Sequence, residues 1–247
     1  KPVYKPVYNV RASGMRGLGV ALALALTPLA EVSEAAAAPN ASAVPEQIHL
    51  SIAGRDAKTA DATGMAVAWF TSQATSTSLV QFGPSPAALS STARGAQHQY
   101  LEDWGFHHHA ELLGLTPGSP VYYRVGDGST WSAVQQFTVP PSAASGAPFN
   151  ISIFGDMGYL GSEERPMKIT IGGLKKHWSA VPTRQRLEQL KNSGEIDMIW
   201  HVGDIGYVDD AYAHEPLHFV YEQAYNGYMN WLQNLTATLP YMVSPGK

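Results

Sequence analysis

Two aspartates stand where their side chains could share a metal ion. Asp156 follows the apolar run Ile151–Phe154 through one glycine, and Asp204 follows a second apolar run, residues 196–200, through His201-Val202-Gly203. Each Gly-Asp pair ends a predicted strand, and open α/β sheets bind their ligands at the carboxyl ends of strands. Carboxylates from neighbouring strands can hold one hard cation, or a pair of cations, between them.

Tyr207 extends this pair, because it lies three residues after Asp204. A phenol beside a carboxylate cluster can become a phenolate ligand of a hard trivalent ion such as Fe(III), which a carboxylate can bridge to a second, divalent ion. Two such metals clamp a phosphate and lower the pKa of a bound water, the usual route to phosphoester hydrolysis. A strand-end aspartate is otherwise a turn or helix cap, and a lone tyrosine is otherwise a core or rim residue. The presence of Asp156, Asp204 and Tyr207 together favours a metal site over these structural roles.

The elements around these residues predict an α/β lobe. Between the two strands, residues 183–191 have helical spacing and end at Asn192-Ser193-Gly194, so a parallel strand pair with a right-handed crossover is expected. Residues 217–235 predict an amphipathic helix of about five turns, and residues 239–243 predict a third strand. The polar, glycine-bearing stretch 159–182 predicts a long surface loop.

Residues 45–140 predict an all-β sandwich of about six or seven short strands separated by turns. The Pro- and Ser-rich residues 141–149 predict a linker. The consecutive His107, His108 and His109 would alternate between the faces of a strand, and we interpret them as a surface or structural cluster rather than a metal site. The three tryptophans of this region are expected in the core or at a domain contact: Trp69, Trp104 and Trp131.

Composition excludes several classes of protein. The chain has 247 residues, 45% of them hydrophobic and 15% charged, which suits a globular protein with one or two domains. A net charge of −4 gives no reason to expect nucleic acid or an anionic membrane as a partner. Cysteine is absent, so disulfides and thiolate metal sites are excluded.

The first residues predict secretion. Residues 1–14 repeat Lys-Pro-Val-Tyr and form an upstream segment of unclear origin, whereas residues 15–38 have the layout of a cleaved signal peptide. Residues 39–44 would be a linker. We therefore expect a secreted or vacuolar protein without stable membrane association. The three Asn-X-Ser/Thr sites are candidate glycosylation sites: Asn40, Asn150 and Asn234.

Motif order and spacing resemble one family, the purple acid phosphatases of the metallophosphoesterase superfamily. Gly155-Asp156-Met157-Gly158 resembles their GDxG motif, and residues 203–207, Gly-Asp-Ile-Gly-Tyr, resemble GDxxY, with His201-Val202 and Asp209 as similar flanks. Residues 231–235 and 239–246 are similar to the segment leading to the third motif, GNH. Residues 109–126 resemble the end of the family's N-terminal domain.

The resemblance implies a fold and a set of roles. Residues 45–140 would be a fibronectin-III-like domain, followed over 150–247 by the N-terminal portion of an α/β metallophosphatase domain, a calcineurin-like β-sandwich with flanking helices. Asp156 would bind Fe(III), Asp204 would bridge to a divalent Zn, Fe or Mn ion, and Tyr207 would be the coloured phenolate ligand. The substrate would be a phosphate monoester. The resemblance leaves open whether the protein forms a homodimer.

The sequence departs from the family after Gly246. The third motif needs Asn and then His there, but residue 247 is lysine, so the expected catalytic histidine lies beyond Lys247 and no catalytic residue is predicted. We therefore expect a truncated form that is inactive or weakly active. Two alternatives remain open: a non-catalytic secreted binding protein, and a related dinuclear metallophosphodiesterase, which Tyr207 and the sandwich disfavour.

Overall fold

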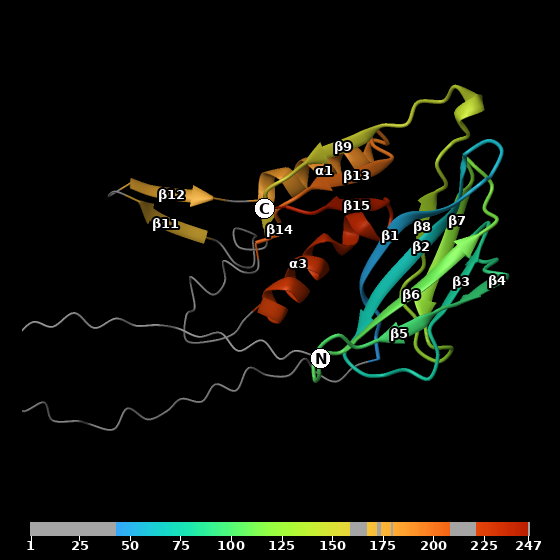
Figure 1. Ribbon diagram of the computed structural model, residues 1–247, viewed down its shortest axis with the longest axis horizontal. Helices are drawn as coiled ribbons and strands as arrows, with labels where there is room; N and C mark the ends of the chain where they lie inside the picture. The colour runs from blue at the N-terminus through green and yellow to red at the C-terminus, as the bar shows by residue number, and fades with distance from the viewer. Residues whose placement is uncertain (1–42, 159–166, 172–173, 179, 208–220, 247) are drawn as a thin grey trace, which may run out of the picture. The chain divides into compact units, whose positions relative to one another are not determined.

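The computed structural model describes residues 43–158, 167–171, 174–178, 180–207 and 221–246 (Figure 1). The predicted upstream segment, the signal peptide and Asn40 lie outside these ranges, as do Asp209 and Lys247. Among the described residues, no helix is long and apolar enough to cross a membrane.

Two antiparallel four-stranded sheets confirm the all-β prediction for residues 45–140. The strands of the first sheet are β1 (Glu46–Arg55), β2 (Ala62–Thr71), β5 (Ala96–His98) and β6 (Phe106–Leu113). Those of the second are β3 (Leu79–Gly83), β4 (Ser91–Arg94), β7 (Pro120–Gly126) and β8 (Gln135–Thr138). The first sheet has the order β1-β2-β6-β5 and the second has the order β4-β3-β7-β8.

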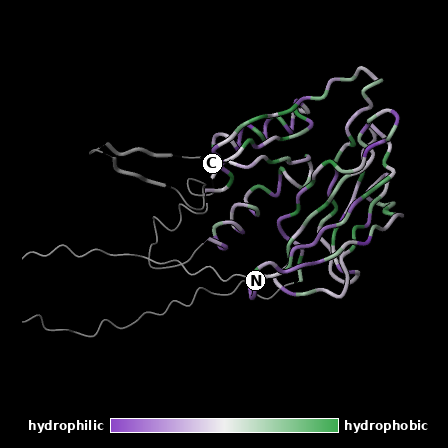
Figure 2. The backbone as a smooth tube through the Cα atoms, viewed as in Figure 1, coloured by the Kyte–Doolittle hydropathy of each residue, from purple (hydrophilic) through white to green (hydrophobic). Residues whose placement is uncertain are grey.

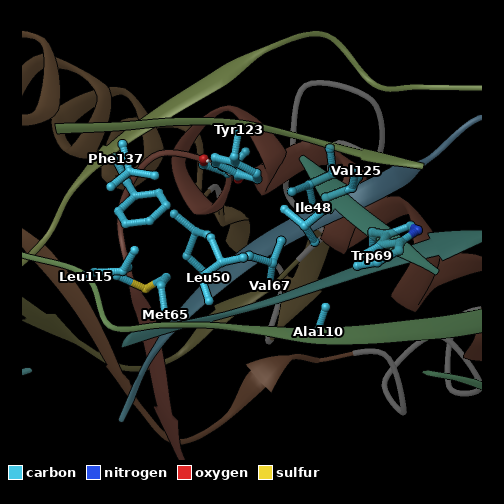
Figure 3. Close-up of a cluster of buried hydrophobic side chains, with 14 of the residues drawn as sticks. Ile48, Leu50, Met65, Val67, Trp69, Ala110, Leu115, Tyr123, Val125 and Phe137 are labelled. Atoms are coloured by element: carbon cyan, nitrogen blue, oxygen red, sulfur yellow. Dashed lines mark hydrogen bonds between the residues drawn. The ribbon is translucent and has the colours of Figure 1, made fainter. Parts of the chain in front are cut away.

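A single hydrophobic core joins these two sheets into the sandwich. Alternate residues of the strands point inward, as the period of two requires, and Figure 2 shows the resulting alternation of hydrophobic and hydrophilic positions along the chain. Leu50, Val67 and Val125 are fully buried, and Figure 3 shows them among side chains from both sheets. Burial of this cluster stabilises the sandwich, since each buried aliphatic side chain contributes about 2 kcal/mol.

The consecutive histidines divide between the two faces of β6, as predicted. His108 is buried and stacks on Trp69 with ring centroids 4.9 Å apart. His107 lies on the opposite face, beside a cavity of about 480 Å³ that residues of helix α3 (Tyr221–Thr236) also line. Trp69 lies in the core, one of the two placements predicted for the tryptophans, whereas Trp104 and Trp131 are partly exposed.

The α/β lobe contains a three-stranded parallel sheet. Its strands are β9 (Ile151–Phe154), β13 (Met198–Val202) and β15 (Tyr241–Ser244), in the order β15-β13-β9. The parallel β9–β13 pair is as predicted, although β13 begins two residues after Ile196. A short 3-10 helix, η1 (Ala143–Ser145), lies in the predicted linker.

Two helices cover one face of this sheet. Helix α1 (Val181–Asn192) places Leu187, and α3 places Tyr228 and Leu232, in one cluster with Ile199 of β13. The opposite face carries side chains that are apolar yet exposed to 40–58%: Ile151, Ile153, Trp200 and Val202. None of the described residues covers that face.

The prediction of a long loop over residues 159–182 is wrong for its second half. β11 (Met167–Ile171) and β12 (Leu174–Trp178) form an antiparallel hairpin, and α1 begins at Val181. The sequence explains the hairpin, because Met-Lys-Ile-Thr-Ile alternates and a Gly-Gly pair separates the two runs, a strong hairpin signal.

Helix α3 also binds the first strand of the sandwich. A bulge in β1 interrupts the ladder between Glu46 and His49, and side chains of α3 satisfy the backbone there. The Ile48 amide donates to Gln233 Oε1 at 3.0 Å, and Thr236 Oγ1 donates to the Ile48 carbonyl at 2.8 Å. The bulge therefore leaves no orphaned buried backbone group at Ile48.

Candidate metal centre

The parallel sheet brings both Gly-Asp pairs to one edge. β9 ends at Phe154 and β13 ends at Val202, each followed by glycine and aspartate. Immediately afterwards, β10 (Met157–Gly158) and β14 (Ile205–Gly206) pair in parallel, so the two chain segments stay in register beyond the aspartates. The strand ends thus place Asp156 and Asp204 side by side, as the sequence predicts.

Tyr207 connects the two carboxylates. Its Oη lies 2.5 Å from Asp156 Oδ1 and 3.1 Å from Asp204 Oδ2. A phenol has one proton, so the short bond is the donation to Asp156, while both carboxylates lie within hydrogen-bonding reach of the Tyr207 oxygen. The side chain of Asp156 is exposed and that of Asp204 is half-buried, so the group opens to solvent.

All three residues have left-handed backbone conformations. The φ angles are 56° at Asp156, 49° at Asp204 and 46° at Tyr207. Such angles are uncommon outside glycine and persist only where the surrounding structure enforces them, which happens most often at functional sites. The backbone is therefore strained at the three positions that the sequence singles out.

Glycines allow the segments to approach this closely. A Cβ at Gly246, which follows β15, would overlap the backbone of Asp204. A Cβ at Gly203 would lie 2.8 Å from the Gly246 Cα, and its φ of 91° is unfavourable for any other residue. Gly158 allows the same approach to the Tyr207 side chain. The third strand of the sheet thus reaches the edge that holds the carboxylates.

Electrostatics keep the Tyr207 phenol protonated in the absence of a cation. The hydrogen bond to Asp156 raises the pKa of Tyr207 well above its usual value, and desolvation and the bond to Asp204 act in the same direction. A cation among these oxygens reverses the effect, because it favours the phenolate over the phenol.

A buried polar group lies directly behind the site, and the sequence pattern predicts no role for it. His201 is fully buried in β13, with Nδ1 2.6 Å from Tyr241 Oη and 3.2 Å from Tyr228 Oη. Burial lowers the pKa of His201 to about 4, against the opposing effects of the Asp156 carboxylate and of the Asp204 backbone and carboxylate. Two signals in the sequence point to this residue: a histidine stands within an apolar strand, and His201-Val202 resembles the flank of the second motif.

The three oxygens fit one side of a site for hard cations. Carboxylates and a phenol are the donors that such ions prefer. In the described regions of the chain, no group of three or more His, Cys, Asp or Glu side chains is arranged to hold a metal ion, so the donors of this edge are two aspartates and a tyrosine.

The side chains of Asn150 and Asn234 are exposed, and their glycosylation stays a prediction.

Comparisons with known proteins agree on one family. A family model described as "Purple acid Phosphatase, N-terminal domain" matches residues 45–139. "Acid phosphatase type 7" of Mus musculus is 31% identical over 210 residues, and "Purple acid phosphatase 15" of Arabidopsis thaliana is 27% identical over 240 residues. Each alignment covers 82% of this chain and 40% of the relative. The chain therefore spans less than half the length of these curated relatives.

The fold has a counterpart among solved structures. The purple acid phosphatase from yellow lupin (Lupinus luteus) seeds superimposes with a TM-score of 0.58 at 16% sequence identity, over 82% of this chain and 35% of that chain. At this identity the likeness concerns the fold alone.

Proposed function

Because the chain belongs to the purple acid phosphatase family, we propose that Asp156, Asp204 and Tyr207 form one side of a dinuclear metal centre that hydrolyses phosphate monoesters. The observation that carries this proposal is the Tyr207 oxygen lying within hydrogen-bonding distance of both strand-end carboxylates. The strained backbone at all three residues supports a functional rather than a structural role.

Each residue has a distinct role in the proposal. Asp156 and Tyr207 would hold Fe(III), whereas Asp204, whose backbone lies against Gly246 after β15, would bridge to a divalent Zn, Fe or Mn ion. When bound, such a pair of metals neutralises phosphate charge and supplies a water of lowered pKa. The chain's own contribution is to hold three oxygen ligands in fixed positions before the metals arrive.

The exposed sheet face supports a larger domain around this centre. Ile153, Trp200 and Val202 would be covered by a second sheet, so that the α/β lobe would form half of a metallophosphatase sandwich. The N-terminal sandwich would then be the fibronectin-III-like domain of the family. We further propose that the protein is secreted, that it forms a homodimer, and that Asn150 and Asn234 are glycosylated.

Phosphate binding tests the proposed function. Isothermal calorimetry would titrate inorganic phosphate into the 247-residue chain, with and without prior loading by Fe(III) and Zn²⁺. We expect phosphate to bind only the metal-loaded wild type, and we expect Asp204→Asn to abolish that binding. Equal phosphate binding by the loaded and metal-free chains would refute the proposal.

A hydrolysis assay tests how much of the centre these residues supply. Three oxygen donors from two loops bind metal more weakly than a complete two-metal site, so we expect para-nitrophenyl phosphate turnover by this chain near background. Robust turnover that depends on Asp156 would show instead that further ligands complete the site.

A further inference from the structure

His201 has one ring nitrogen that the folded core leaves without a partner. The side chain is fully buried, and its Nε2 forms no hydrogen bond within the described regions of the chain. A buried donor or acceptor without a partner is costly, and such groups are rare in native cores. An unsatisfied group this close to a candidate site needs a functional explanation.

Two tyrosines determine which nitrogen carries the proton. Tyr228 Oη lies 3.0 Å from Tyr241 Oη, which lies 2.6 Å from His201 Nδ1. The shortest contacts are satisfied when Tyr228 donates to Tyr241 and Tyr241 donates to Nδ1, since each hydroxyl has a single proton. Nδ1 is then an acceptor, and the neutral ring carries its proton on Nε2.

The unpartnered His201 N–H lies toward the end of the sheet at which Asp156 and Asp204 stand. His201 precedes Asp204 by three residues along the chain, and its ring packs on Phe154, which lies two residues before Asp156, at 4.7 Å between centroids. The Asp204 backbone lies at the limit of hydrogen-bonding reach of the ring, short of a well-formed bond, and it favours the charged form of the ring together with the Asp156 and Asp204 carboxylates. Of the two aspartates, Asp204 is the half-buried one, and its backbone is the group that the ring approaches as a hydrogen-bond partner.

We propose that His201 is a positioning residue for Asp204. When the Asp204 carboxylate binds a cation, His201 Nε2–H donates a hydrogen bond to the Asp204 segment. The Tyr228–Tyr241 pair fixes the tautomer that makes this donation available. This inference rests on the proposed metal centre. Groups of this kind, one hydrogen bond behind the ligands, orient the ligands and change metal affinity when they are lost. The strained φ of 49° at Asp204 is the conformation that such a bond would hold.

Two amide substitutions separate positioning from packing. In His201→Gln the amide can reach the Nε2 position, whereas in His201→Asn it reaches only the Nδ1 position beside Tyr241. Both variants keep a polar group in the core, so urea unfolding of the metal-free chains should be similar. We expect Zn²⁺ affinity, measured by calorimetry, to fall about 10- to 100-fold in His201→Asn and to stay near the wild-type value in His201→Gln.

Nuclear magnetic resonance gives a readout that does not depend on metal. Long-range ¹H–¹⁵N spectra should show His201 as the Nε2–H tautomer in the wild type and as a mixture of tautomers in Tyr241→Phe. An Nδ1–H tautomer in the wild type, or wild-type Zn²⁺ affinity in His201→Asn, would overturn the inference while Asp204→Asn still lost the metal. Equal Zn²⁺ affinity of the wild type and Asp204→Asn would overturn the proposed centre and this inference with it.

Discussion

His108 should make the sandwich sensitive to acid. The ring is 1% exposed and stacks on Trp69. Thr71 Oγ1 donates to the Gln73 carbonyl at 2.6 Å, so His108 Nε2 must donate to Thr71 Oγ1, and Ser78 Oγ donates to Nδ1. The core thus holds the neutral ring with both nitrogens satisfied.

Burial lowers the pKa of His108 from 6.5 to about 4, with His107 and His98 acting in the same direction. The unfolded chain therefore binds a proton at higher pH than the folded chain does. The stability that depends on this group is fully present above pH 6.5 and is lost as the pH falls toward 4. This single group should remove about 2 kcal/mol of unfolding free energy between about pH 7.5 and about pH 5, and about 3 kcal/mol in total.

Urea unfolding followed by tryptophan fluorescence at about pH 7.5 and about pH 5 measures this loss. His108→Gln keeps an amide in place of the ring and cannot titrate, so its loss between the two pH values should be smaller than that of the wild type by about 2 kcal/mol. The matched control is His109→Gln, which removes an exposed neighbouring histidine and should retain the wild-type loss. Equal pH dependence in the wild type and His108→Gln would refute the reasoning.

Three further substitutions test other regions of the structure. Gly203→Ala should destabilise the chain by about 2 kcal/mol or more, because it adds steric overlap to an unfavourable φ, whereas Gly194→Ala, whose Cβ would meet open space, should cost about 1 kcal/mol; equal urea midpoints would contradict the close approach at the site. Tyr123→Phe removes the 2.7 Å bond to the Ala237 carbonyl and should cost about 2 kcal/mol in the same assay, and an unchanged midpoint would show that the carbonyl finds another donor. Ile153→Lys on the exposed sheet face should change stability by less than about 0.5 kcal/mol and reduce light scattering from self-association; a large loss of stability would mean that this face is covered.

The carboxylate pair can be predicted from the sequence, because local pattern and sheet geometry are enough to place it. An apolar run followed by Gly-Asp defines a strand end, and two parallel strands must end at the same edge. Tyr207 directly follows β14, which pairs with β10 beside Asp156, and its hydroxyl meets both aspartates there.

Other features depend on long-range contacts that the sequence pattern does not encode. His201 meets Tyr228 and Tyr241, which are 27 and 40 residues away along the chain, so its tautomer and its unpartnered nitrogen emerge only in the folded core. The strands β4 and β5 lack an apolar period, because they are short and mostly exposed. The β11–β12 hairpin differs from both cases, since its alternation and its Gly-Gly pair are visible in the sequence and would have been enough to predict it.

The colour of the iron-loaded chain tests the central claim most directly. Fe(III) would be titrated into the wild type and into Tyr207→Phe, which removes only the phenolic oxygen, and visible absorption would be recorded. We expect a phenolate-to-Fe(III) charge-transfer band in the wild type that is absent in Tyr207→Phe. The same band in both proteins, or in neither, would contradict the assignment of Tyr207, Asp156 and Asp204 to one metal centre.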